Sequence, residues 1–270
     1  MTAIIGLFCN EGIVIASESQ ESDDEIGMKR LDVTKVYDTK RFGFIDVQII
    51  VAGTGTSACT ARAAELIAEK GYAPHFTTPR SVASLVEDCM GDMKTRYGNK
   101  LDLELLVGVY CRHCPETEEE KDTDRPPPEI GLFSVSAPEE DENVGVAESI
   151  TDYSALGSGG LFARYLLNRL HDEEHSTMTL GIDQAIREAV YVIEEVKKVD
   201  LWCGGPTQLI CIKKNGDECV LEKKKPKELA KIATEMNELD QNIKREQRSL
   251  FSPSDSRSPK RNRQIGATQT

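Results

Sequence analysis

The sequence has 270 residues, and 33 Lys and Arg against 46 Asp and Glu give a formal net charge of −13. This acidic balance argues against a general nucleic-acid binder or a protein that binds anionic membranes, so neither partner is expected. No run of about 18 apolar residues is present, so no transmembrane helix is predicted. The first residues, MTAIIGLFCNEG, lack the basic segment and the cleavage site of a signal peptide, which predicts a cytoplasmic protein. The eight cysteines are accordingly expected to be reduced.

Short apolar segments predict a series of strands. Residues 3–9 (AIIGLFC) and 13–17 (IVIAS) flank a turn signal at 10–12, so they are predicted to form a β-hairpin. The acidic stretch 21–25 is predicted to be a loop. Further strands are predicted at 33–38, 43–52, 103–110 and 129–137, and a strand–turn–strand is predicted after residue 199.

Helix formers and four-residue apolar spacing predict helices between these strands. They are expected at about 57–70, 81–97, 162–170, 180–198 and 226–248. The elements therefore run as strands, two helices, strands, two helices and strands. Paired helices favour a layered α+β sandwich, with helices on both faces of stacked antiparallel sheets, over a doubly wound parallel sheet.

The domain organisation follows from composition. We predict one domain at 1–224, interrupted by a flexible acidic insertion at about 112–128 and a second acidic loop at 138–144. A charged helix at 225–250 and a basic, Ser-rich tail at 251–270 are predicted to follow, and the tail is expected to be disordered.

Thr2 is the first candidate for chemistry. Methionine aminopeptidases remove Met1 when the next residue is small, which would leave Thr2 with a free α-amine beside its hydroxyl. Such a residue carries both a nucleophile and a base. The amine titrates near ~8, close to the pH at which it must work. Taken alone, a Thr at position 2 is common, and a strand start is the more frequent explanation.

Five further segments strengthen this interpretation, in the order and near the spacing of one family. They are Glu18, sixteen residues after Thr2, Lys35 in DVTKV, AGT at 52–54, LGSGG at 156–160 and DLWCGG at 200–205. On these elements the sequence resembles the proteasome β-subunit family and its bacterial relatives, among the N-terminal nucleophile hydrolases. The resemblance spans residues 2–214 and is weak through 112–150. It implies a four-layer αββα sandwich.

The resemblance also implies roles for individual residues. The Thr2 hydroxyl would attack a peptide carbonyl, and Lys35 would place a positive charge beside it. Glu18 would orient the lysine, and the Gly53 N–H would stabilise the oxyanion, an interaction worth roughly 3 kcal/mol. Three residues would surround the amine: Ser158, Asp200 and Cys203.

The implied activity is that of a threonine-type endopeptidase. The resemblance further implies a polypeptide substrate, a self-compartmentalised homo-oligomer such as a ring, and a possible ATP-dependent unfoldase as partner. The chemistry requires no metal and no cofactor.

Departures from the family pattern keep two alternatives open. Glu18 stands where the family has Asp, Cys203 where it has Ser, and Thr54 where it has a second Gly. A longer carboxylate shifts the lysine geometry, and a thiol is a poorer hydrogen-bond partner than a hydroxyl. One alternative is therefore a catalytically inactive scaffold or regulatory subunit. The other is an amidohydrolase that acts on a small amide, because the fold alone does not fix the substrate.

Three other motifs are interpreted as structural. Residues 171–175 (HDEEH) match the H-x-x-E-H pattern of zinc peptidases, but a solvated helix end is the better reading of so charged a stretch. Cys111 and Cys114 have C-x-x-C spacing without a second ligand pair, which is more typical of a strand end. The Gly-rich turn at 157–160 lacks the Lys-Ser/Thr of a P-loop, so close backbone packing is favoured.

Overall fold

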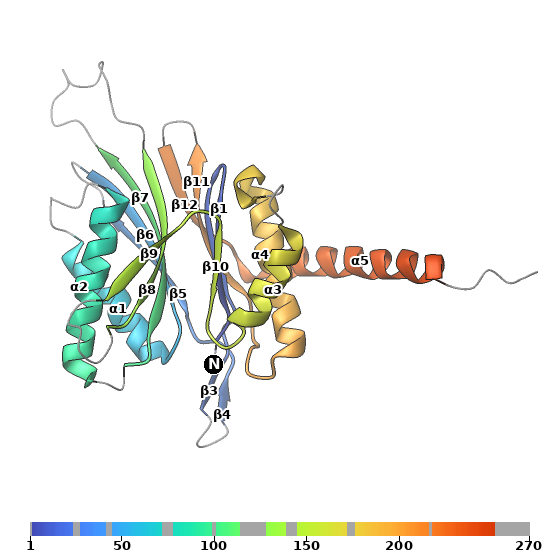
Figure 1. The fold of residues 1–270 in the computed structure, drawn as a ribbon, viewed down its shortest axis with the longest axis horizontal. Helices are drawn as coiled ribbons and strands as arrows, with labels where there is room; N and C mark the ends of the chain where they lie inside the picture. Colours follow the sequence, from blue (N-terminus) through green and yellow to red (C-terminus); the bar gives the residue numbers. More distant parts are fainter. Residues whose placement is uncertain are drawn as a thin grey trace, which may run out of the picture.

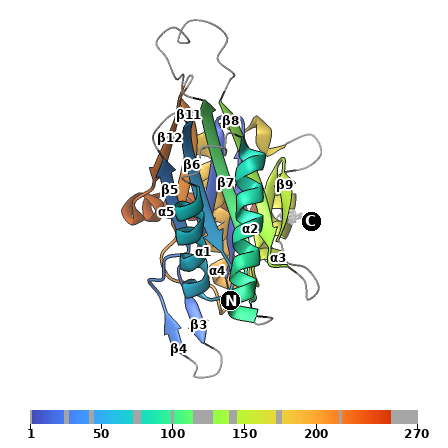
Figure 2. The ribbon, with the colours of Figure 1, turned by 90° about the vertical axis from the view of Figure 1, so that its left-hand side faces the viewer.

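The computed structural model describes residues 2–23, 28–41, 45–71, 78–98, 101–113, 128–138, 145–171, 176–215 and 218–251. The described residues form two five-stranded antiparallel sheets, a separate two-stranded ribbon and five α-helices (Figures 1 and 2).

The first sheet has the strand order β10-β1-β2-β11-β12. Its strands are β1 (Ile4–Cys9), β2 (Gly12–Ser17), β10 (Tyr153–Leu156), β11 (Gln208–Asn215) and β12 (Glu218–Lys223). The predicted hairpin is present as β1 and β2, with Cys9 opposite Gly12 across a two-residue turn.

The second sheet has the order β5-β6-β7-β8-β9. Its strands are β5 (Val36–Arg41), β6 (Ile45–Gly53), β7 (Glu104–His113), β8 (Glu129–Ser136) and β9 (Val146–Ile150). The ribbon pairs β3 (Glu21–Asp23) with β4 (Met28–Arg30), so the first part of the acidic stretch 21–25 is a strand and not the predicted loop.

Three apolar cores hold these elements together. Successive side chains of a strand point to opposite faces, so Ile4 packs between the two sheets while Ile5 packs toward the helices. Helices α3 (Gly160–Leu170) and α4 (Ile182–Val199) cover the outer face of the first sheet. Helices α1 (Ser57–Lys70) and α2 (Pro79–Tyr97) cover the outer face of the second.

The expected four-layer αββα sandwich is wrong as a description of this chain. The structure has a fifth helix, α5 (Pro226–Phe251), which crosses α4 and then projects away from both sheets (Figure 1). The ribbon β3–β4 likewise lies beyond the end of the sheets. The sequence predicts this helix at 226–248 but not its direction, which depends on where Leu229 and Ile232 join the core that α4 forms with the first sheet.

Several predicted features lie outside the described residues. They are most of the insertion at 112–128, nearly all of the loop at 138–144, the tail beyond residue 251, residues 172–175 of the HDEEH motif, and Cys114. His171, the first residue of that motif, is described, and its Nε2 lies 2.8 Å from Glu188 Oε2.

The seven described cysteines are free thiols. Among the described helices, none is both long and apolar enough to cross a membrane.

Candidate functional site

The segments that carry the predicted site residues meet at one end of the two sheets. Thr2 lies two residues before the first residue of β1, and Glu18 directly follows β2, which runs antiparallel to β1. Lys35 directly precedes β5, and Gly53 ends the neighbouring strand β6. The sheet topology therefore brings together residues that are far apart in the sequence.

Lys35 is the centre of the site. Its side chain and those of its two predicted partners are buried: Lys35 is 3% exposed, Thr2 2% and Glu18 0%. The Lys35 Nζ donates to Thr2 Oγ1 at 2.9 Å and also to Glu18 Oε1 and the Gln20 carbonyl. An ammonium group has three N–H donors, and here each of them meets an oxygen. One of the three points at the hydroxyl of Thr2.

The Glu18 carboxylate is fully engaged as an acceptor. Its Oε1 accepts from the Ala3 amide at 3.3 Å in addition to Lys35. Its Oε2 accepts from the amides of Gln20 at 2.5 Å and Gly204 at 3.3 Å. A buried carboxylate is costly unless it is paired and hydrogen-bonded, and this one is both. Glu18 thus contacts the lysine while its carboxylate also accepts from three backbone amides.

The Gly-rich turn 157–160 holds the backbone of Thr2. The Thr2 amide donates to Ser158 Oγ at 3.2 Å, and the Gly159 amide donates to the Thr2 carbonyl at 3.1 Å. Gly157 has a φ of +84°, and a Cβ at this position would lie 2.2 Å from the Thr2 carbonyl oxygen. Only glycine fits such a conformation and such an approach. The turn is therefore a backbone clamp for Thr2.

Gly53 is placed differently from its predicted role. Its amide donates to the Lys35 carbonyl at 3.4 Å, one position beyond the end of the β5–β6 ladder. An oxyanion donor must point at the position of the developing charge. The Gly53 N–H has a different acceptor in this structure, so its role in catalysis stays a prediction.

Asp200 and Cys203 form a pair beside the clamp. The Cys203 thiol lies 3.3 Å from Asp200 Oδ2, and Asp200 Oδ1 accepts from the Trp202 amide at 2.9 Å. A Cβ on Gly159 would lie 2.9 Å from Cys203 Sγ, so the thiol lies against the clamp. Burial, together with the negative charges of Glu18 and Asp200, raises the pKa of Cys203 far above its usual value. The thiol therefore stays neutral at pH 7. It lies between the Asp200 carboxylate and the turn 157–160 that holds Thr2.

Two glutamines belong to the site and were missed in the sequence. The backbone of Gln20 contacts both Lys35 and Glu18. Gln208 accepts from the Lys35 amide at 2.9 Å through Oε1 and donates to the Val33 carbonyl at 2.7 Å through Nε2. One signal could have pointed to Gln20: the polar run SESQ at 17–20, which is buried throughout, follows an apolar strand without a turn residue. No sequence signal marks Gln208.

The comparisons with known proteins identify the fold. No model of a protein family matches the sequence, and no curated protein matches it. Solved structures match over nearly the whole chain. Anbu from Yersinia bercovieri, described as the ancestral beta-subunit, is 14% identical with a TM-score of 0.65, covering 93% of this chain and 98% of that one. The Anbu complex from Pseudomonas aeruginosa, solved as a helical assembly, is 16% identical with a TM-score of 0.66, covering 95% and 100%.

A third match is the Gly-1 mutant of Anbu from Hyphomicrobium sp. strain MC1, 13% identical with a TM-score of 0.66, covering 94% and 100%. At these identities the likeness shows the fold alone. The assignment to the proteasome β-subunit family, drawn from short motifs, is therefore corrected, because no family model supports it and the matching structures are Anbu proteins. The chain has the fold of the Anbu proteins.

Proposed function

We propose that this protein is an N-terminal threonine hydrolase that cleaves peptide bonds with Thr2 after removal of Met1. The observation that carries the proposal is the 2.9 Å contact between Lys35 Nζ and Thr2 Oγ1, made by a lysine that is buried with the Glu18 carboxylate. A buried cation in contact with a hydroxyl favours the alkoxide-like form of that hydroxyl.

The proposed reaction proceeds in two steps. The Thr2 α-amine takes the hydroxyl proton while Oγ1 bonds to the substrate carbonyl carbon, and Lys35 stabilises the charge that develops on Oγ1. The C–N bond of the substrate then breaks, the departing amine takes the proton from the Thr2 ammonium, and an ester to Thr2 remains. In the second step the amine activates a water molecule, which hydrolyses this ester and frees the acid product and Thr2.

Met1 controls this chemistry. In the chain as encoded, the Thr2 nitrogen is part of a peptide bond and cannot act as a base. The same nitrogen already donates to Ser158 Oγ. After Met1 removal, Ser158 and the turn around it would hold the α-amine beside the Thr2 hydroxyl.

The experiment is intact mass and N-terminal sequencing after treatment with a peptide epoxyketone, which needs both the hydroxyl and the free amine of an N-terminal residue. We expect loss of Met1 and an adduct on Thr2, and no adduct in Thr2→Ala. Thr2→Ser is the matched control, because it keeps both groups and should still react. An assembled sample with a free Thr2 and no adduct would contradict the proposal.

We further propose that the chain assembles with copies of itself. Anbu from P. aeruginosa, which shares the fold, was solved as a helical assembly. A site that opens only inside such an assembly would restrict which polypeptides reach Thr2. The mass of the particle must therefore be recorded with every activity measurement.

A second candidate function is that of an inactive subunit with the same fold. It is favoured by the Gly53 amide, which donates to the Lys35 carbonyl, and by the neutral Cys203 thiol in place of a hydroxyl. Retention of Met1 in the assembled protein would support this candidate.

Gln208 offers a test of how Lys35 is positioned. Replacing Gln208 with Ala removes the acceptor of the Lys35 amide and the donor to Val33, and it should lower the rate of adduct formation about tenfold, because small displacements of reacting groups are costly. Gln208→Glu keeps the acceptor and should restore part of the rate. Equal rates for wild type and Gln208→Ala, measured by mass spectrometry over time, would show that Lys35 does not depend on this contact.

A further inference from the structure

Two segments of the chain lie on either side of Lys35. The first, residues 18–21, continues from β2 into β3, and the second, residues 53–57, joins β6 to α1. The Lys35 Nζ donates to a carbonyl of the first segment, and the Lys35 carbonyl accepts from an amide of the second. Figure 2 shows the ribbon β3–β4 and one end of α1 at the end of the molecule where the chain begins. The two segments therefore border the Thr2 hydroxyl, which the same lysine contacts.

The side chain of Glu21 spans the two segments. Its Oε1 accepts from the Ser57 amide at 2.9 Å, at the first residue of α1, where the helix dipole stabilises a carboxylate. Its Oε2 lies 3.5 Å from Arg30 Nη1 on the other strand of the ribbon. Burial raises the pKa of Glu21, but the hydrogen bonds from the backbone and side chain of Ser57 and the charges of Arg30 and Lys35 outweigh burial, so the pKa is lowered. The carboxylate is therefore charged at pH 7.

We propose that the contact between Glu21 and Ser57 is a latch that closes the entrance to Thr2 and must open before an extended peptide reaches the site. The clamp 157–160 occupies the backbone side of Thr2, so a substrate carbonyl approaches Oγ1 from the side that the two segments border. Thr2 is almost completely buried while the latch is closed. This inference rests on the proposed function, because it takes a peptide to be the molecule that enters.

Both halves of the latch have another partner once it opens. The Glu21 carboxylate keeps Arg30, which lies on the same ribbon. The Ser57 amide is one of the N–H groups in the first turn of α1 that have no acceptor within the helix, so it can donate to a carbonyl of the peptide. The latch and the peptide therefore compete for one donor. Because a closed form reduces the apparent affinity by the fraction of molecules that are open, loss of the latch should tighten peptide binding.

The test measures the entry of a peptide without chemistry at Thr2. In a Thr2→Ala background a dye-labelled peptide epoxyketone forms no adduct, so fluorescence anisotropy gives its dissociation constant alone. Adding Glu21→Ala should tighten this binding about tenfold, which is the effect expected from removing one hydrogen bond to a charged group. Glu21→Gln keeps a neutral acceptor for the Ser57 amide, so its affinity should fall between the two.

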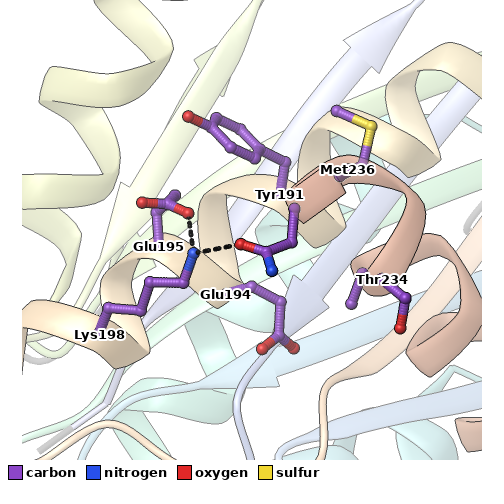
Figure 3. Close-up of a pocket in the computed structure, with 8 residues that line it drawn as sticks. Tyr191, Glu194, Glu195, Lys198, Thr234 and Met236 are labelled. Carbon is purple, nitrogen blue, oxygen red and sulfur yellow. Dashed lines mark hydrogen bonds and ion pairs between the residues drawn. The ribbon is translucent and has the colours of Figure 1, made fainter. Parts of the chain in front are cut away.

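Glu195→Ala is the matched control. Glu195 is also a partly buried glutamate with an ion-pair partner, Lys198, and its side chain is 17% exposed, compared with 24% for Glu21. It lines a cavity of about 250 Å³ between α4 and α5, which lies outside both sheets (Figure 3). This substitution should leave peptide binding unchanged.

A second variant opens the latch from its other half. Ser57→Pro removes the amide that donates to Glu21, and proline is well tolerated at the first position of a helix. Thr56 has φ −79° and ψ 140°, the extended conformation that a residue before proline prefers. Ser57→Pro should tighten binding as much as Glu21→Ala does. The double variant should bind no more tightly than either single variant, because both remove the same contact.

The latch is overturned if Glu21→Ala and Ser57→Pro bind the peptide no more tightly than the Thr2→Ala parent. It is also overturned if their effects add in the double variant. These outcomes do not depend on catalysis. With Thr2 restored and Met1 removed, tighter binding without an adduct would contradict the proposed function and leave the latch in place.

Discussion

Replacing Lys35 with Met is expected to lower the free energy of unfolding by about 3–5 kcal/mol, because it leaves a buried charge without its partner. The uncompensated group is Glu18, which is fully buried and whose Oε1 would keep only the Ala3 amide as donor. Urea titration of the purified protein, at constant assembly state, measures this loss.

A double variant separates the charge from the packing. Adding Glu18→Gln to Lys35→Met removes both charges and keeps an oxygen that can accept from the Gln20 and Gly204 amides. We therefore expect the double variant to be more stable than Lys35→Met alone, because replacing a whole buried ion pair is much less costly than breaking it. Strictly additive losses in the two single variants and the double variant would show that Glu18 and Lys35 do not stabilise each other.

The sequence predicted the members of this ion pair but not the contacts that hold them. Apolar alternation marks β1 and β2, and the motif order placed Thr2, Glu18 and Lys35 in one site. The contact between Gln208 and Lys35 could not be predicted, because the two residues are 173 positions apart in the sequence. Nothing in the local sequence distinguishes Gln208 from any other polar residue at the start of a strand.

The short strands β3 and β10 and the direction of helix α5 were less predictable than the rest of the fold. The strand β3 has three residues inside an acidic stretch, and β10, for which the sequence predicts no strand, ends directly before the Gly-rich turn at 157–160. Both form because partner strands supply the hydrogen bonds, which is a tertiary effect that overrides local preference. The sequence showed α5 as a helix, yet its direction away from the sheets depends on where its apolar stripe meets α4.

The same double variant gives the sharpest test of the proposed chemistry. If the Lys35 charge stabilises the attacking oxygen, Glu18→Gln/Lys35→Met should be folded and free of Met1 but should form the Thr2 adduct at least about 100-fold more slowly than wild type, the size of effect seen when one preorganised electrostatic contact is removed. The comparison is the initial rate of epoxyketone modification at equal assembly state, with Thr2→Ser as a control that keeps the lysine. A rate within threefold of wild type would mean that the Thr2 amine suffices and that the buried ion pair serves the fold alone. The stability measurements distinguish these cases, because an ion pair that only supports the fold changes the free energy of unfolding without changing the reactivity of Thr2.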